Sequence, residues 1–335
     1  MSRELENDAL TLRTVPIVGS MPQRNTRTAH LPSESKRSRI VCTVLAAVLL
    51  LLAASLESKA SELNPNTLKA WDTYVQAQDL RVAENSHSGA FLWSDQSSGR
   101  LRRLREGEVL VAPIGENPKV VPHGLIHHWI GAVFFPDTDL DHVLAVVRDY
   151  DRYKEFYSPN VIESSLLHRE NMNDAFSIVM LNKAVIAKFA LKAEFENSYS
   201  PLDKNRCYGV AHSTRIRELE DYGQASQHEL PPNTGHGFIW RLYNVSRFEQ
   251  RDGGVYVELE TVALSRDVPA ALRWVVNPAV RRVSKGSLLV SLQKTQNAVL
   301  ATSEHASRAP RKNQEIDERP ASASTTLAQS RATLR

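Results

Sequence analysis

Apolar and polar side chains alternate along several stretches of the chain, which is the pattern of β-strands with one covered face. The clearest case is residues 185–199, where Phe189, Leu191 and Phe195 share a face opposite lysine and glutamate side chains. Because successive side chains of a strand point to opposite sides, this stretch predicts an antiparallel strand with one solvated face. Further strands are predicted at residues 89–93, 108–113, 125–135, 175–181, 206–216, 237–249 and 254–265.

A hairpin signal joins the last two of these strands. Asp252-Gly253-Gly254 lies between them, and Asp-Gly pairs readily adopt the positive φ angles of tight two-residue turns. On the second arm, Val257 and Leu259 share a face that Glu258 and Glu260 oppose. We therefore expect the two glutamates on a solvated face, paired with neighbouring basic residues.

Apolar residues at helical spacing predict the helices. Asp137 or Thr138 can cap a helix, and Pro278 should kink the last one because proline removes a hydrogen bond. The predicted helices are residues 64–82, the apolar face of Leu140, Val143, Leu144 and Val147, a short helix at 152–157, and a long helix from Asp267 to about Val299.

An uncharged apolar run at residues 40–56 follows the basic residues Arg37 and Arg39. About 17 apolar residues fit the core of an export signal or a short membrane span. Small residues at Ser58 and Ala60 predict cleavage after Ala60, and an uncleaved signal anchor is the alternative. Residues 36–60 are therefore predicted to export the chain to a periplasm or outside the cell, with tethering through residues 40–56 left open.

The regions around this segment complete the expected organisation. Residues 1–35 and 301–335 are polar, contain prolines and lack apolar periodicity, so both are predicted to be disordered. Formal net charge is only +3, from 41 Lys and Arg against 38 Asp and Glu, and we expect no nucleic-acid partner. Of the two cysteines, Cys42 lies in the export segment, so Cys207 is expected to be a small strand residue without a disulfide.

The order of these elements, and one junction in particular, carry a family resemblance. Residues 146–159 read Val-Val-Arg-Asp-Tyr-Asp-Arg-Tyr-Lys-Glu-Phe-Tyr-Ser-Pro, with Val161-Ile162 after them, and residues 272–299 form the closing helix. Residues 125–300 resemble the START-like, Bet v 1-like superfamily, which includes proteins labelled polyketide cyclase/dehydrase. The resemblance implies an α+β helix-grip fold: a curved antiparallel sheet of about seven strands wrapped around a long C-terminal helix. Residues 61–124 lie outside it and are expected to be an N-terminal helical extension packed on the same domain.

Proteins of this superfamily hold apolar ligands between the sheet and the long helix. The resemblance therefore implies a module that binds an apolar or amphipathic, lipid-like small molecule, with a membrane surface as a further partner. Trp240 is expected to face the ligand and Arg241 to bind its polar end; the alternative is a core Trp240 and a solvated Arg241. Ligand entry is expected at the loop before residue 161 or at the loop 220–236. The candidate ligand-binding residues are Phe189, Leu191, Phe195, His212, Trp240, Arg241, Tyr243, Val257, Leu259, Trp274 and Val275.

The sequence gives little sign of catalysis. His123, His127 and His128 form a cluster, but no H-E-x-x-H motif is present, and in a strand His127 and His128 point to opposite faces. There is no G-x-S-x-G element, glycine-rich phosphate loop or C-x-x-C pair, so we predict no catalytic residue, no metal and no cofactor. Two alternatives remain: a cyclase or aromatase that uses acid and base groups of the cavity, and an envelope interaction protein whose cavity is filled.

Overall fold

The computed structural model of the protein describes residues 61–87, 91–183 and 188–308. The predicted export segment, residues 36–60, and the first predicted disordered end lie outside these residues, as does residue 309 onward. Within the described residues, no helix combines the length and apolar character needed to cross a membrane.

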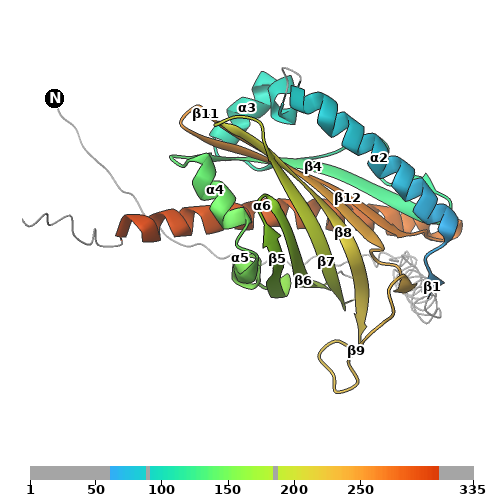
Figure 1. The fold of residues 1–335 in the computed structure, drawn as a ribbon. Coiled ribbons are helices and arrows are strands. Elements are labelled where there is room, and N and C mark those ends of the chain that lie inside the picture. The colour runs from blue at the N-terminus through green and yellow to red at the C-terminus, as the bar shows by residue number, and fades with distance from the viewer. Residues whose placement is uncertain (1–60, 88–90, 184–187, 309–335) are drawn as a thin grey trace, which may run out of the picture. The chain divides into compact units, whose positions relative to one another are not determined.

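The centre of the fold is a ten-stranded antiparallel sheet, in the order β2-β4-β12-β11-β8-β7-β6-β5 (Figure 1). Strand β3 also pairs with β4, strand β9 pairs with β8, and β1 pairs separately with β10. The strands are β1 Ser61–Glu62, β2 Leu110–Pro113, β3 Lys119–Val121, β4 Gly124–Pro136, β5 Val161–Glu170, β6 Asn173–Lys183, β7 Lys188–Pro201, β8 Arg206–Glu220, β9 His228–Glu229, β10 Thr234–Gly235, β11 Arg241–Arg251 and β12 Gly254–Arg266.

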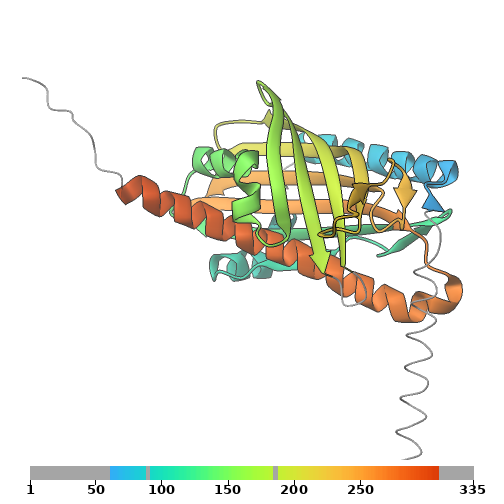
Figure 2. The same cartoon turned by 90° about the horizontal axis from the view of Figure 1, so that it is seen from below.

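Helices lie on both sides of this sheet (Figures 1 and 2). We call the side contacted by α6 the inner face and the side covered by α2 the outer face. The helices are α2 Pro65–His87, η1 Trp93–Gln96, α3 Ser98–Arg105, α4 Leu140–Val147, η2 Tyr150–Arg152, α5 Tyr153–Phe156, η3 Ala270–Leu272 and α6 Arg273–Arg308.

Helix α6 packs closely on the inner face of β4. Its Leu288 and Leu292 share one buried apolar cluster with Trp129 and Val133 of β4. A Cβ atom added to Gly131 would lie 2.5 Å from the Cδ1 atom of Leu292, so the absence of a side chain at this position allows the close approach. This confirms the predicted α+β class and helix-grip arrangement. The sheet has more than the expected seven strands because β2 and β3, from residues 61–124, extend the edge at β4, and β9 adds to β8.

Helix α2 covers the outer face of the same central strands. Trp71, Val75 and Val82 of α2 pack in one cluster with Ile126 of β4 and Val262 of β12, among other apolar residues. The central strands therefore have two covered faces. This explains why β4 is buried at every position from Gly124 to Phe135 and shows no apolar–polar alternation.

The outer position of α2 overturns one prediction. Glu258 and Glu260 were expected on a solvated face, but both side chains are fully buried. Glu260 pairs with Arg81 of α2, with Arg247 at 2.9 Å and with His128 at 2.7 Å. Glu258 accepts hydrogen bonds from the backbone N–H groups of η1. The alternation was read correctly, but a helix from another part of the chain covers the polar face.

Local features follow the sequence with small shifts. The Asp252-Gly253 hairpin is confirmed, with φ angles of 55° and 79°. Helix α4 is capped by Asp139, not by Asp137 or Thr138, and its carboxylate accepts from the His142 amide at 2.8 Å. Residues 91 and 92 do not form the predicted strand at 89–93; they lead into η1 instead. The last helix begins at Arg273, after η3, and runs to Arg308, so residues 301–308 are helical and not disordered as predicted.

Candidate ligand-binding face

The centre of the inner face carries no charge among the described residues. Strand alternation and pairing place uncharged side chains there along β4, β12 and β11, and along β8 as far as Ser213. Charged side chains of the same strands, such as Arg247 and Glu260, lie on the outer face. The inner-face residues of the first three strands are Leu125, His127, Trp129, Gly131, Val133 and Phe135; Val255, Val257, Leu259, Thr261, Ala263 and Ser265; and Leu242, Asn244, Ser246, Phe248 and Gln250.

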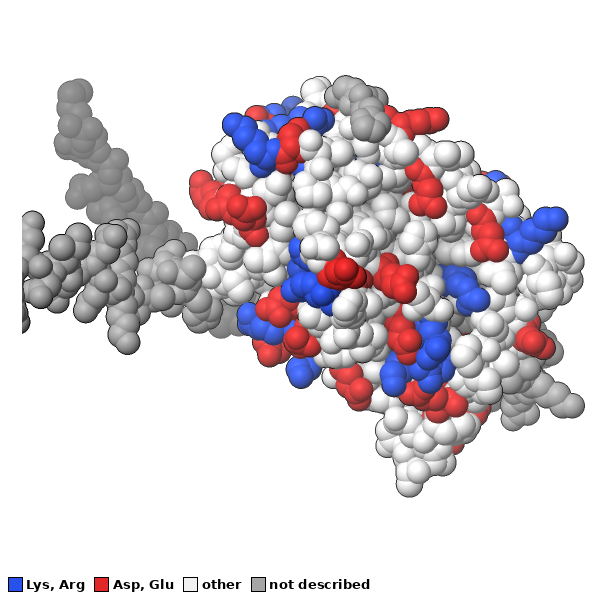
Figure 3. Space-filling model, viewed as in Figure 1, with Lys and Arg blue, Asp and Glu red and all other residues white. Residues whose placement is uncertain are grey.

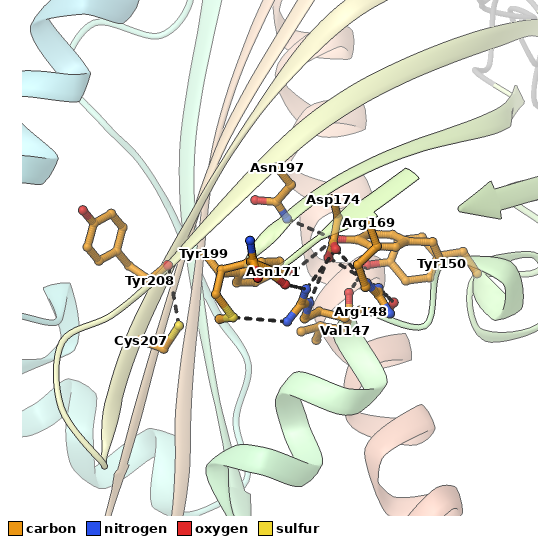
Figure 4. A network of polar contacts seen from close by, with 12 residues as sticks. Val147, Arg148, Tyr150, Arg169, Asn171, Asp174, Asn197, Tyr199, Cys207 and Tyr208 are labelled. Carbon is orange, nitrogen blue, oxygen red and sulfur yellow. Dashed lines mark hydrogen bonds and ion pairs between the residues drawn. The ribbon is translucent and has the colours of Figure 1, made fainter. Parts of the chain in front are cut away.

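One end of this face is closed by a polar network around Asp174 of β6 (Figure 4). The buried carboxylate accepts from Arg148 at 2.8 and 2.9 Å, from Arg169 at 2.7 Å and from the Tyr150 hydroxyl at 3.1 Å. Burial alone would raise the pKa of Asp174, but the hydrogen bonds and charges of the two arginines outweigh it and lower that pKa. Asp174 is therefore a paired structural carboxylate.

Beside this network, aromatic rings cover the inner face of β6 and β7. Phe176 stacks on Tyr150 with ring centroids 4.1 Å apart and on Phe195 with centroids 5.0 Å apart. Asn197 of β7 donates from its amide nitrogen to the Tyr150 hydroxyl at 3.3 Å. This end of the face is thus filled by aromatic side chains.

A loop folds over the inner face where β8 ends. Glu218 of β8 lies opposite Leu191 and accepts from the backbone N–H groups of His236 at 2.7 Å and Gly237 at 2.8 Å. The next residue of the loop, Phe238, stacks on Phe189 of β7 with centroids 4.4 Å apart. The carboxylate therefore fixes the loop at the edge of the apolar face, at the end of the loop 220–236 where we expect ligand entry.

Buried polar atoms without a partner lie on the uncharged centre. His127 and Trp129 of β4 are 4% and 7% exposed, and the Nδ1 atom of His127 and the Nε1 atom of Trp129 have no hydrogen-bond partner among the described residues. On β7, beside the Asp174 network, the Oδ1 atom of Asn197 also has no partner among the described residues. Buried polar groups are nearly always paired, so three such atoms on one face point to a ligand or solvent site.

The polarity of this site follows from the burial of His127. Its Nε2 atom lies 3.0 Å from the Ser265 hydroxyl, and burial lowers the pKa of the ring to about 4. The imidazole is therefore neutral at physiological pH. The site offers hydrogen bonds without offering a charge.

Five of the predicted ligand-binding residues lie on the inner face. Leu191 and Phe195 are buried in the cluster that also contains Ile178 and Ile216, and Phe189 packs against it. Val257 and Leu259 belong to the cluster that includes α6. Their contact with a ligand stays a prediction.

Four others lie on the outer face, and Trp240 takes the core position that the alternative interpretation gave it. Trp240 and Tyr243 are buried against α2, and the Tyr243 hydroxyl donates to Asp79 of that helix at 2.9 Å. His212 lies beside Tyr243, with ring centroids 4.9 Å apart. Arg241 shares the face of Tyr243 by strand alternation and feels the charge of Asp72 of α2, so it does not reach the space under α6.

Of the two candidates on the last helix, Trp274 does not close the site. Trp274 was expected to close the cavity but is 77% exposed. The side chain of Val275 lies outside the described part of the structure. The helix residues that contact the sheet come later, at Leu288 and Leu292.

Sequence reasoning missed His127, Trp129 and Asn197. The sequence favoured an ordinary polar or half-buried histidine at position 127 over a metal ligand. Its expected orientation, opposite to that of His128, is confirmed, because His128 binds Glu260 on the outer face. The available signal was a histidine and a tryptophan two residues apart in an apolar strand, which places both on one face. Without knowledge of α2, that face could not be identified as inner or outer.

Two surface pockets lie away from this face. One, of about 600 Å³, runs between α2 and β3 and is lined by Tyr74 and Val121, with exposed Lys69 and Lys119 at its margin. The other, of about 470 Å³, lies near His123 and is the pocket that Trp240 does line. On the face of the molecule seen in Figure 3, basic and acidic side chains are interspersed.

Comparison with known proteins identifies similar folds. No family model matches the chain, and no curated protein matches its sequence. Similar solved structures include a STAR-related lipid transfer protein from Xanthomonas axonopodis, with 15% identity over 57% of this chain and 98% of that one and a TM-score of 0.37. They also include the Zhui aromatase/cyclase from Streptomyces, with 14% identity over 55% and 97% of the two chains and a TM-score of 0.36. Human STARD10 has 12% identity over 64% and 83%, and a TM-score of 0.37.

At this level of sequence identity, the similarity extends to the fold alone. The function has to be argued from the residues of this protein. Its own topology, an antiparallel sheet with α6 packed along the inner face, is the helix-grip fold that the sequence resemblance implied.

Proposed function

We propose that this protein is an exported binding module that holds an apolar or amphipathic small molecule between the inner face of the sheet and α6, without catalysis. The observation that carries the proposal is the combination found at the centre of that face. It is uncharged and largely apolar, yet it buries polar atoms at His127 and Trp129 that have no partner among the described residues.

Burial of apolar surface supplies the affinity in this proposal. Leu242 and Leu259 on this face are only partly buried, as is Met180 of β6, so apolar surface there remains for a ligand to cover. At about 25 cal/mol per Å², covering roughly 300 Å² of apolar surface is worth about 7 kcal/mol before the costs of association. The unpartnered polar atoms would set the orientation of the ligand.

The enzyme alternative finds no support in the arrangement of titratable groups. A cyclase would need an acid and a base that converge on the ligand. Of the described inner-face residues, His127 lies on β4, Glu218 on β8 and Asp174 on β6. Glu218 is held at the edge of the face by the backbone amides of the loop and by the His236 ring at 3.0 Å. Asp174 is also held by Arg148 and Arg169.

Export is a separate part of the proposal and rests on the sequence. Residues 36–60 combine the basic flank, the apolar run and the small residues before Ala60 that a signal peptidase reads. N-terminal sequencing of the chain recovered from an expressing bacterium tests it: a terminus at Ser61 supports cleavage, and an intact, cytoplasmic chain contradicts export.

Binding is tested on the full chain with an environment-sensitive apolar dye and with mass spectrometry of solvent extracts. Ala263 is half-buried on the inner face, so Ala263→Phe should fill the space and weaken dye binding at least tenfold. Ala83→Phe, on the exposed side of α2, is the matched control and should leave dye binding unchanged. Thermal unfolding of both variants confirms that they fold.

Two results would overturn the proposal. One is a chain that yields no extractable small molecule and binds no dye when folded, which would favour the interaction-protein alternative. The other is dye binding that Ala263→Phe leaves intact, which would place the dye elsewhere.

A further inference from the structure

Building on the proposed function, we infer that the inner face selects an amphiphile whose polar end is an uncharged hydroxyl group, held between His127 and Trp129, and that it discriminates against carboxylates. The inference rests on three features of this end of the face: the hydrogen-bond roles of the two side chains, their spacing, and the absence of a cation.

The hydrogen-bond roles follow from Ser265. Its hydroxyl donates to the backbone oxygen of Arg266 at 3.3 Å, so its oxygen is left to accept from the Nε2 atom of His127 at 3.0 Å. A neutral imidazole carries one N–H group, and placing it at Nε2 makes Nδ1 an acceptor. The Nε1 group of Trp129 can only donate. The site therefore presents one free acceptor and one free donor.

The spacing lets one small group satisfy both. His127 and Trp129 occupy successive same-face positions of β4, about 7 Å apart along a strand. A single oxygen about 3 Å from each nitrogen bridges two such side chains when they lean toward each other, so that the nitrogens lie within about 6 Å. A hydroxyl both donates and accepts, so it matches the pair, whereas an ionised carboxylate only accepts and would leave Nδ1 unpaired.

Charge discrimination comes from the surroundings. Among the described residues, the inner faces of β4, β12 and β11 carry no Lys or Arg, and the neighbours of His127 across the ladder are Ala263 and Ser265. On these strands, Arg247 is held in a buried ion pair with Glu260 and points to the outer face. In the turns of α6 before Leu288, the basic residues Arg281, Arg282 and Lys285 are exposed. A carboxylate buried against the strands would therefore lack a cation, which is a large cost, while a hydroxyl meets no such cost.

Helix α6 carries a further buried polar atom near its start. Asn277 lies eleven residues, or about three turns, before Leu288, which packs on β4. Its Oδ1 atom is buried and has no partner among the described residues. Among the described residues, unpartnered hydrogen-bonding atoms thus occur on both β4 and α6.

The test compares two probes of equal chain length, hexadecan-1-ol and hexadecanoate, as competitors of the bound dye on the full chain at pH 8. We expect the alcohol to bind at least tenfold more tightly than the carboxylate. Ser265→Ala removes the group that fixes the ring, and Trp129→Phe removes the donor. Each should reduce the ratio of the two affinities at least threefold. Ala83→Phe serves as the control that leaves the ratio unchanged.

The ratio is informative because a merely destabilised protein would lose both probes together. Equal binding, or tighter binding of hexadecanoate, overturns the hydroxyl inference and leaves the proposed function standing. The hydroxyl inference is also overturned if neither probe displaces the dye although Ala263→Phe prevents the dye from binding. Absence of any dye binding removes the proposed function itself.

Discussion

His127 and His128 follow each other in β4 but reach opposite faces of the sheet. The Nε2 atom of His127 lies 3.0 Å from the Ser265 hydroxyl on the inner face, while that of His128 lies 2.7 Å from Glu260 beneath α2. One strand therefore serves both the proposed ligand-binding face and the buried charged cluster that attaches α2.

Glu260 should be essential for the attachment of α2. Burial alone would raise its pKa, but the hydrogen bond from His128 and the charges of Arg247 and Arg81 lower it to about 2. Glu260→Gln should lower the free energy of unfolding at pH 7 by roughly 3 kcal/mol, because it leaves buried cations without a partner. Urea unfolding measures this effect.

The pH dependence of the Glu260 effect has a defined sign. A depressed carboxylate pKa stabilises the fold above the unfolded value of about 4.5, and this contribution is lost as the pH falls towards 2. The difference between wild type and Glu260→Gln should shrink over that window. Glu155→Gln, which removes an exposed charge paired with Arg152, should change stability by less than about 1 kcal/mol. A constant difference across the window would contradict the pairing.

His127 should give a second, less acidic transition in stability. Its pKa falls to about 4 on folding because the ring is buried, so the unfolded chain binds a proton more readily between about pH 6.5 and 4. Stability from this group is full above that window and lost as the pH decreases. Between pH 7 and 4.5, the free energy of unfolding of His127→Gln should fall by about 2 to 3 kcal/mol less than that of wild type, as measured by urea unfolding. An identical loss in both proteins would show that the ring is solvated.

The Asp174 network should hold α4 and η2 against β6. Asp174→Ala leaves Arg148 and Arg169 without their carboxylate and should cost about 3 to 5 kcal/mol of stability. Asp141 is exposed on α4, so Asp141→Ala should change the free energy of unfolding by less than about 0.5 kcal/mol. Thermal and urea unfolding of both variants provide the measurement, and equal stability of the two would refute a structural role for the network.

Glu218 should keep the loop at residues 236–238 closed over the edge of the inner face. A glutamine has one acceptor oxygen and cannot satisfy all the amides that Glu218 binds. In Glu218→Gln, amide hydrogen exchange of His236 and Gly237 should therefore accelerate several-fold, as measured by mass spectrometry. Glu220→Gln, exposed further along β8, is the control and should leave these amides protected.

The strands and their faces could be read from the sequence where one face is solvated. Residues 188–199 of β7 follow the predicted alternation, with Leu191 and Phe195 inside and Lys192 and Glu194 outside. In β11 both faces are covered, so alternation places Tyr243 and Val245 on one face without showing which helix covers that face. For that reason, the sequence could not separate candidates on the inner face, such as Leu191, from Tyr243 on the outer face.

Local chemistry along the chain determined the order of the strands, the turn at Asp252-Gly253 and the helical character of residues 273–299, because side-chain period and turn propensity act between near neighbours. Only the tertiary structure decided which face α6 grips and which α2 covers. Helices α2 and α6 are far apart in the sequence and pack on opposite faces of one sheet. Which face each helix covers depends on contacts between residues more than a hundred positions apart. That packing buried Glu260 beside Arg247 on one side. On the other side it left the Nδ1 atom of His127 and the Nε1 atom of Trp129 without a partner in the part of the chain that the structure describes.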